Sequence, residues 1–269
     1  MRASGRFSAD LAGYALATSL ACEPEVIAGS WPCAGSNAVR AGEGGESGVV
    51  TVTDPIGLPW ASGFEDGFCG YTDVSGFCYA DPDASYELVR SPVRSGKFAA
   101  AFRVAGDPAA DGVQSRCVRQ GTMPTAAYYG AWYFIPALVN TKGNWNLFHF
   151  QGGVAPVLHG LWDVSLANED DGSLRLYVFD FLRRAPRRAS DVPPVPIGSW
   201  FHIEVFWRRA ADQTGRFAVY QDGELAFEID DVETDDTEYA QWYVGNLAES
   251  LDPPGSTLFV DDVTIRTTR

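Results

Sequence analysis

The residues of this chain that are best suited to chemistry lie between positions 128 and 153, where aromatic side chains and one histidine follow each other in two strand-like runs. In the second run, spacing by two residues puts four side chains on one face of a strand: Trp145, Leu147, His149 and Gln151. A tryptophan ring offers a flat apolar platform for a sugar ring, and a histidine beside a glutamine offers hydrogen bonds to hydroxyls or an acid–base group. The pattern therefore predicts a sugar-binding groove. The alternative is an ordinary sheet surface above a phenylalanine core.

Strands must position these residues, because strand signals recur along the chain and no segment shows sustained helical periodicity. The expected strands are 97–104, 113–120, 129–135, 144–151, 160–167, 174–181, 200–208, 216–221, 224–229, 241–244 and 258–265. Asp222-Gly223 and Asp171-Gly172 predict tight hairpin turns, since glycine accepts the positive φ that such turns need. Short strands joined by such turns favour an all-β fold, an antiparallel two-sheet jelly-roll sandwich.

Composition agrees with one sizeable β domain. The chain has 269 residues, 28 of them glycine and 16 proline, and 13% are aromatic. Its formal net charge is −15, which argues against nucleic acid or an anionic membrane surface as a partner. We expect a monomer with a polysaccharide partner, and an acidic polymer would require a local basic site.

The first residues are typical of an export signal. Arg2 and Arg6 precede an apolar run at 11–21 that is too short to span a bilayer. The run ends at Ser19-Leu20-Ala21-Cys22, which resembles a bacterial lipobox, although leucine stands two rather than three places before the cysteine. We expect residues 1–21 to be a signal peptide and Cys22 to be lipidated, giving a cell-surface or outer-membrane lipoprotein. Ordinary secretion is the alternative. Any membrane contact would be through the lipid anchor only.

The segment 22–48 is rich in Gly, Ser and Glu and is typical of a flexible tether, so we expect the folded domain to span 49–269. If Cys22 carries lipid, four cysteines remain, and their connectivity is open between three pairings. Cys69 and Cys78 flank a turn-like stretch and form our preferred bridge, with Cys33–Cys117 as its complement. No Cys/His cluster predicts a zinc site.

Several segments carry a family resemblance. In order, the chain contains YYGAWYFIP, NWNLFHFQ, PVPIGSWFHIEVFW, GRFAVYQDGELAFEID and LFVDDVTI. This succession resembles the concanavalin A-like lectin/glucanase jelly roll over 64–265, and within it the polysaccharide-lyase branch with its alginate-, glucuronan- and heparin-lyase-like families. The segments indicate architecture more than chemistry, because binding modules share the fold.

The resemblance implies a reaction and a set of residues. Such lyases remove the C5 proton of a uronate with a His or Tyr base, protonate the leaving oxygen with a Tyr acid, and neutralise the carboxylate with Gln, Asn or Arg. His149 and Gln151 match the family's Q-x-H in reversed order, and Arg116 matches the arginine of a neighbouring strand, with Gln114 on the same strand face. These residues are the expected base, neutralising groups and substrate contact.

The expected acid departs from the family pattern. The late tyrosine position is Leu247 here, and the nearest phenol is Tyr243, four residues earlier. The lyase hypothesis therefore depends on Tyr243 lying beside His149. Hydrolysis is disfavoured, because no strand carries the paired carboxylates that retaining glycosidases of this fold use.

Two charged features complete the candidates. Arg183, Arg184, Arg187 and Arg188 form a basic cluster that could bind carboxylates or sulfates. Alternatively, the cluster balances the acidic stretch 230–238. Glu65 near the domain's start and Asp261 near its end are expected in neighbouring first and last strands, where oxygen ligands could hold a structural Ca²⁺. No cofactor is expected to be required.

The sequence thus predicts a carbohydrate-active jelly roll that binds a polysaccharide. Non-catalytic binding ranks first because of Leu247, a lyase acting on a uronate polymer by β-elimination is the alternative, and a structural or adhesive surface role is a further one.

Overall fold

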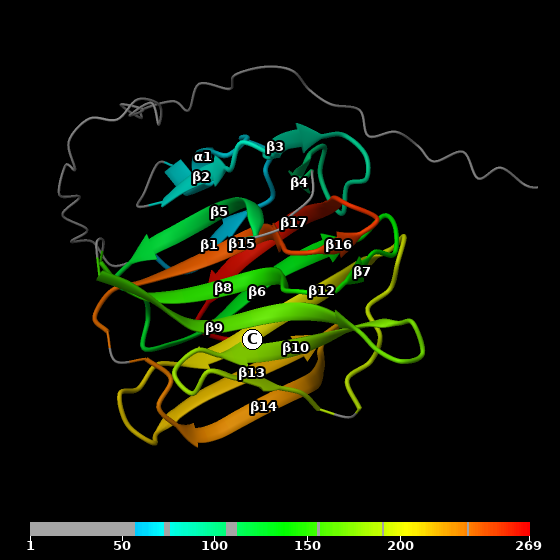
Figure 1. Ribbon diagram of the computed structural model, residues 1–269. Coiled ribbons are helices and arrows are strands. Elements are labelled where there is room, and N and C mark those ends of the chain that lie inside the picture. Colours follow the sequence, from blue (N-terminus) through cyan, green and yellow to red (C-terminus); the bar gives the residue numbers. More distant parts are fainter. Residues whose placement is uncertain (1–56, 73–75, 106–111, 155–156, 190, 236) are drawn as a thin grey trace, which may run out of the picture.

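The computed structural model describes residues 57–72, 76–105, 112–154, 157–189, 191–235 and 237–269. Two large antiparallel sheets pack face to face in this part of the chain (Figure 1). The predicted all-β jelly-roll sandwich is confirmed. The predicted signal peptide, the lipidation of Cys22, the tether and Cys33 lie outside the described residues. Within these residues, no helix has the length and hydropathy needed to cross a membrane.

The first sheet has one edge at β14 and the other at β3. Its order is β14 (Glu224–Val232), β13 (Gly215–Gln221), β12 (Trp200–Arg208), β6 (Ala126–Phe134), β17 (Ser256–Arg266), β4 (Ala99–Val104) and β3 (Ala84–Val89), with β1 (Trp60–Ser62) also beside β17. The first and last strands are therefore neighbours, as the resemblance implied.

The second sheet carries the site described below. Its order is β11 (Ala185–Arg187), β10 (Leu174–Asp180), β9 (Val157–Asn168), β8 (Trp145–Val154), β15 (Ala240–Ala248), β5 (Val113–Gly121) and β2 (Gly76–Ala80). The remaining elements are the short helix α1 (Cys69–Thr72) and the paired strands β7 (Asn140–Thr141) and β16 (Leu251–Asp252).

Aromatic rings from both sheets fill the space between them. The Phe150 ring of the second sheet lies 5.3 Å from Tyr129 and 5.0 Å from Trp207 of the first, measured between ring centres. Trp242 of the second sheet lies 5.2 Å from Tyr129. All four rings are fully buried. Since burying one such side chain stabilises the fold by about 1.5–3 kcal/mol, this cluster fixes which face of each strand turns inward.

Both predicted hairpin turns are confirmed. Asp222 and Gly223 join β13 to β14 with φ angles of 50° and 90°. Gly172, with φ of 80°, lies in the turn between β9 and β10. Positive φ at both central residues of the first turn matches the right-handed twist of the two strands it joins.

The predicted Cys69–Cys78 bridge is wrong. Cys78 of β2 is bonded to Cys117 of β5, directly opposite it in the register of the two strands, with a Cα–Cα distance of 4.0 Å. Cys69 is also disulfide-bonded and therefore belongs to another bridge. The error arose because β2 pairs with β5, a contact between strands far apart in sequence that turn chemistry does not reveal.

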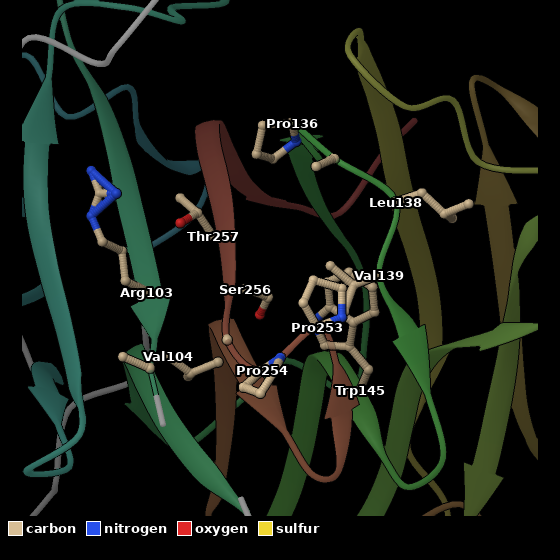
Figure 2. A pocket seen from close by; sticks show the side chains of 13 residues that line it. Arg103, Val104, Pro136, Leu138, Val139, Trp145, Pro253, Pro254, Ser256 and Thr257 are labelled. Atoms are coloured by element: carbon tan, nitrogen blue, oxygen red, sulfur yellow. The ribbon is translucent and has the colours of Figure 1, made fainter. Parts of the chain in front are cut away.

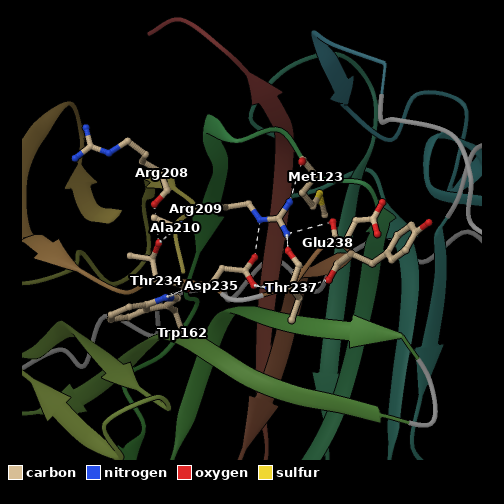
Figure 3. Close-up of polar contacts among 10 residues, drawn as sticks. Met123, Trp162, Arg208, Arg209, Ala210, Thr234, Asp235, Thr237 and Glu238 are labelled. Atoms are coloured by element: carbon tan, nitrogen blue, oxygen red, sulfur yellow. Dashed lines mark hydrogen bonds and ion pairs between the residues drawn. The ribbon is translucent and has the colours of Figure 1, made fainter. Parts of the chain in front are cut away.

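A buried ion pair anchors the chain where it enters β15. The Arg209 guanidinium lies 2.5 Å from Asp235 Oδ2 and donates to the carbonyls of Met123 and Thr237 at 2.8 and 2.7 Å (Figure 3). The Asp235 side chain is fully buried. Breaking such a pair leaves an uncompensated buried charge, so this contact holds the segment before β15 and Tyr243 in place.

Candidate functional site

Polar side chains line the outer face of the second sheet, on the side of β5, β15, β8 and β9 that turns away from the aromatic core. Two rows cross the strands. Gln241 of β15 is in register with Gln120 on one side and Gln151 on the other. Two residues along, Tyr243 is in register with His149, which is itself in register with Asp163 of β9. We call these residues, together with Arg116 and Asn146, the polar face.

Tyr243 and His149 come together on this face. Their ring centres are 5.1 Å apart, with planes inclined by 67°. The Tyr243 hydroxyl donates to Gln151 Oε1 at 2.7 Å and also lies against Gln241 Oε1. Burial raises the pKa of Tyr243, and the nearby Tyr79 raises it further, while Arg116 lowers it. Tyr243 therefore keeps its proton at neutral pH and can act as a proton donor.

His149 is held by a carboxylate. Its Nδ1 lies 2.5 Å from Oδ1 of Asp163. On its other side the His149 ring meets the edge of Phe181, with 5.8 Å between ring centres. With Nδ1 bonded to Asp163, the second ring nitrogen, Nε2, is the one left to act on a substrate.

Arg116 and Asn146 supply donors beside the tyrosine. An Arg116 Nη donates to Asn146 Oδ1 at 2.6 Å, and the guanidinium carbon lies 5.6 Å from the centre of the Tyr243 ring. Both side chains are buried, and within the described structure Arg116 Nε and Asn146 Nδ2 have no acceptor. Burial lowers the pKa of Arg116, and the nearby phenols and Asp163 raise it. Two unsatisfied donors at the floor of a polar surface are suited to a carboxylate ligand.

The predicted tryptophan platform is wrong. Trp145 is fully buried and donates from its indole nitrogen to Asn246 Oδ1 at 3.1 Å. Its ring lies near Val139 and Pro253 at a pocket of about 430 Å³ at one end of the sandwich, which contains no residue of the polar face (Figure 2). The register of β8 shifts between Asn146 and Phe148, and such a bulge reverses the alternation, so Asn146 rather than Trp145 shares a face with His149.

Aromatic side chains are nevertheless present beside the polar face, on β10. Leu174, Leu176 and Val178 turn inward, so Tyr177 and Phe179 point outward, and Phe181 follows after the strand. The rings of Phe179 and Phe181 are 4.8 Å apart, and the Phe181 ring lies over Gly160, where a Cβ atom would come within 2.9 Å of it. The alternation of LRLYVFDF in the sequence is the signal that could have revealed them.

The predicted arginine cluster is largely paired within its own hairpin. Arg183 and Arg187 each lie 3.2 Å from Asp180 Oδ2, and the Asp180 side chain is fully buried. Arg188 lies 3.1 Å from Glu169 and over the ring of Tyr177. Arg184 is exposed and, within the described structure, forms no ion pair. The cluster therefore offers far less free charge than its sequence indicated. Among the described residues, its pairing with the acidic stretch 230–238 is confined to a contact between Arg183 and the Glu233 carbonyl.

Gln114 lies on β5 beside the same face, and its side chain accepts a hydrogen bond from the Tyr79 hydroxyl at 2.9 Å.

The two carboxylates expected to bind calcium, Glu65 and Asp261, instead accept hydrogen bonds from the backbone of a loop. Glu65 Oε1 accepts the backbone N–H groups of Lys97 and Phe98, and Asp261 Oδ2 accepts those of Arg94 and Ser95.

Burial raises the pKa of Asp261 to about 6. In the described part of the chain, no group of three or more carboxylate, histidine or cysteine side chains is arranged to hold a metal ion. These contacts explain both carboxylates without an ion, and calcium, which prefers six to eight oxygen ligands, stays a prediction.

Solved structures share this architecture. The crystal structure of an endo-β-1,4-glucuronan lyase from the fungus Trichoderma reesei matches with a TM-score of 0.57 and 16% identity, over 71% of this chain and 90% of that one. The cellulose-induced protein Cip1 matches with a TM-score of 0.54 and 15% identity, over 78% and 97%. No protein-family model matches the sequence, and no curated protein matches it. At this identity the likeness shows a shared fold alone.

Proposed function

We propose that this protein is a polysaccharide lyase that cleaves a uronate-containing polymer by β-elimination. The observation that carries the proposal is the convergence of Tyr243 and His149, 5.1 Å apart between ring centres, beside Arg116 on one outer face. The sequence departure at Leu247 weighed against a lyase because it removed the expected acid. Tyr243 supplies a phenol next to the histidine from another position on the same strand.

The proposed reaction assigns one task to each group. His149 Nε2 takes the C5 proton of the uronate, the electron pair forms the C4=C5 double bond, and the C4–O4 bond breaks. Tyr243 gives its proton to O4 of the leaving sugar. The site is reset when one proton passes from His149 back to Tyr243.

The carboxylate of the substrate is the group that makes the C5 proton removable. Arg116 Nε and Asn146 Nδ2 are buried donors that lack acceptors within the described structure, and we assign the uronate carboxylate to their side of the Tyr243 ring. A cation and an amide at this place also stabilise the charge that develops on the carboxylate as the proton leaves. The glucuronan lyase with the same fold suggests 1,4-linked glucuronate as the first polymer to test.

The test is ultraviolet absorbance of the protein incubated with glucuronan, alginate, pectate and heparin, because elimination creates a conjugated double bond. We expect absorbance to rise with one of these polymers, and we expect His149→Gln to abolish the rise. His202→Gln, on the outer face of the first sheet, is the matched control and should leave it unchanged. No rise with any polymer, with the folded wild-type chain, would contradict the proposal.

Binding without cleavage is the second candidate, and the outward rings of Tyr177, Phe179 and Phe181 favour it because sugars stack on such surfaces. Retention on immobilised polymers without any absorbance change would support this function.

A further inference from the structure

We infer that Asp163 is a positioning residue that holds His149 in the tautomer with the proton on Nδ1, so that Nε2 presents its lone pair to the substrate. The catalytic part of this inference rests on the proposed lyase function. No motif in the sequence pointed to Asp163, which lies in the predicted strand 160–167 without any assigned role.

The contact is short and enclosed. The Nδ1–Oδ1 distance is 2.5 Å, and the Asp163 and His149 side chains are 5% and 17% exposed. The two residues are in register on neighbouring strands, β8 and β9, so the backbone ladder fixes their separation. A buried carboxylate is costly unless it is hydrogen-bonded, and an ionised carboxylate can only accept. Nδ1 must therefore carry the proton that joins the two groups.

The other charged and titratable groups around the pair do not take over this role. Arg116 of β5 is near enough for Asp163 to raise its pKa, but its hydrogen bond goes to Asn146. Tyr243 of β15 meets the His149 ring edge to face, and its hydroxyl donates to Gln151. On β10, burial raises the pKa of Tyr177, and the charge of Asp163 adds a smaller contribution in the same direction. Within the described residues none of these groups forms a hydrogen bond with Asp163, so its carboxylate is left to orient the histidine.

Replacing Asp163 by asparagine separates orientation from packing. An asparagine has the same shape but can donate from its amide, and an amide that donates to Nδ1 requires the imidazole proton on Nε2. In that tautomer Nε2 of His149 has no lone pair for the C5 proton, because the remaining lone pair is on Nδ1. Where a carboxylate holds a catalytic histidine in another enzyme family, the same substitution lowers kcat by about 10⁴-fold, so we expect a loss on the order of 10²–10⁴-fold with KM little changed.

The experiment combines nitrogen-15 NMR of the histidine ring nitrogens with lyase kinetics, on the full chain. His149→Gln identifies the His149 signals by their loss. We expect the wild type to show the proton on Nδ1, and Asp163→Asn to move it to Nε2 and to lower kcat as above. Ser165→Ala is the matched control, since Ser165 lies two residues further along β9 and donates to Asn144; it should change neither measurement.

A wild-type spectrum with the proton on Nε2 would overturn the inference, and this measurement does not depend on the folding of any variant. An Asp163→Asn spectrum identical to that of the wild type would overturn it as well. An intact Nδ1–H signal in a wild-type protein that cleaves no polymer would instead overturn the proposed function and, with it, the catalytic role of Asp163. The spectrum and the kinetics thus distinguish the two failures.

Discussion

The two sheets each place a histidine against an aromatic ring on their outer face, at the same distance but with different chemistry. His202 lies 5.1 Å from Trp132 on the first sheet, and His149 lies 5.1 Å from Tyr243 on the second. Aspartates accompany both, but Asp222 accepts the backbone N–H of His202, whereas Asp163 binds the His149 ring itself. An arginine also lies beside each aromatic ring: Arg94 over Trp132 and Arg116 near Tyr243. A ring with a transferable proton and a carboxylate on the imidazole therefore distinguish the candidate site on the second sheet from the packed surface of the first.

The largest expected effect comes from replacing the two histidines, one at a time. We expect His149→Gln to lower the elimination rate by about 10²–10⁴-fold, the usual contribution of a general base. His202→Gln should keep the wild-type rate. Initial rates of absorbance change on the preferred polymer measure both. Equal losses in the two variants would show that His149 has no special role.

The next effect concerns the aromatic rings beside the two histidines, Tyr243 beside His149 and Trp132 beside His202. Tyr243→Phe removes only the hydroxyl, so we expect a loss of about 10²-fold or more in kcat because the leaving oxygen receives no proton. Trp132→Phe should keep kcat. The hydrogen bond to Gln151 is also lost in Tyr243→Phe, at a cost of about 1 kcal/mol in the free energy of unfolding. Urea unfolding checks that both variants are folded, and full activity of Tyr243→Phe would rule the phenol out as the acid.

The two arginines, Arg116 and Arg94, should differ in their effect on a substrate that carries carboxylates. Arg116→Met should lower kcat/KM on uronate polymers by about 10- to 150-fold, the equivalent of one hydrogen bond to a charged group. Arg94→Met should not change it. Binding of the same polymer with its carboxylates reduced to alcohols should be alike in the wild type and Arg116→Met. A difference that persisted on the reduced polymer would mean that Arg116 contacts something other than the carboxylate.

The smallest expected effect concerns His202 and stability. Burial lowers the pKa of His202 from its usual 6.5; the charge of Glu204 raises it by a smaller amount, and the charge of Arg266 lowers it further. The unfolded chain therefore takes up a proton at a higher pH than the folded protein does. The contribution of His202 to stability is full above about pH 6.5 and is lost as the pH falls through the lower folded value. Urea unfolding at pH 7.5 and 5.5 should show a smaller pH-dependent loss in His202→Gln than in the wild type; an unchanged dependence would contradict this.

Local alternation predicted most of the fold. Strands such as β12 and β13 were found because their inward residues alternate with polar ones and because Asp222-Gly223 joins β13 to β14. The edge strands β2 and β3 were missed, since their pairing depends on β5 and β4 rather than on their own sequence. The bridge between Cys78 and Cys117 was missed for the same reason.

The site was predictable only as far as residue types allow. His149, Gln151 and Arg116 were candidates because of their residue types and spacing, and Tyr243 meets His149 because β15 is in register with β8. No sequence pattern could give the bulge that turns Trp145 inward and Asn146 outward. Asp163 stood as a single acidic residue within an apolar strand, a signal that becomes meaningful only when β9 is paired with β8.

The fully buried side chain of Asp180, paired with Arg183 and Arg187, has a consequence for how the protein would meet a polyanion. Most proteins that capture charged polymers do so with free cations, and added salt weakens their binding by screening the attraction. Here the arginines are compensated internally and the chain carries a net charge of −15. Encounter with an acidic polymer is therefore opposed at long range, and we expect capture to become faster, not slower, as ionic strength rises.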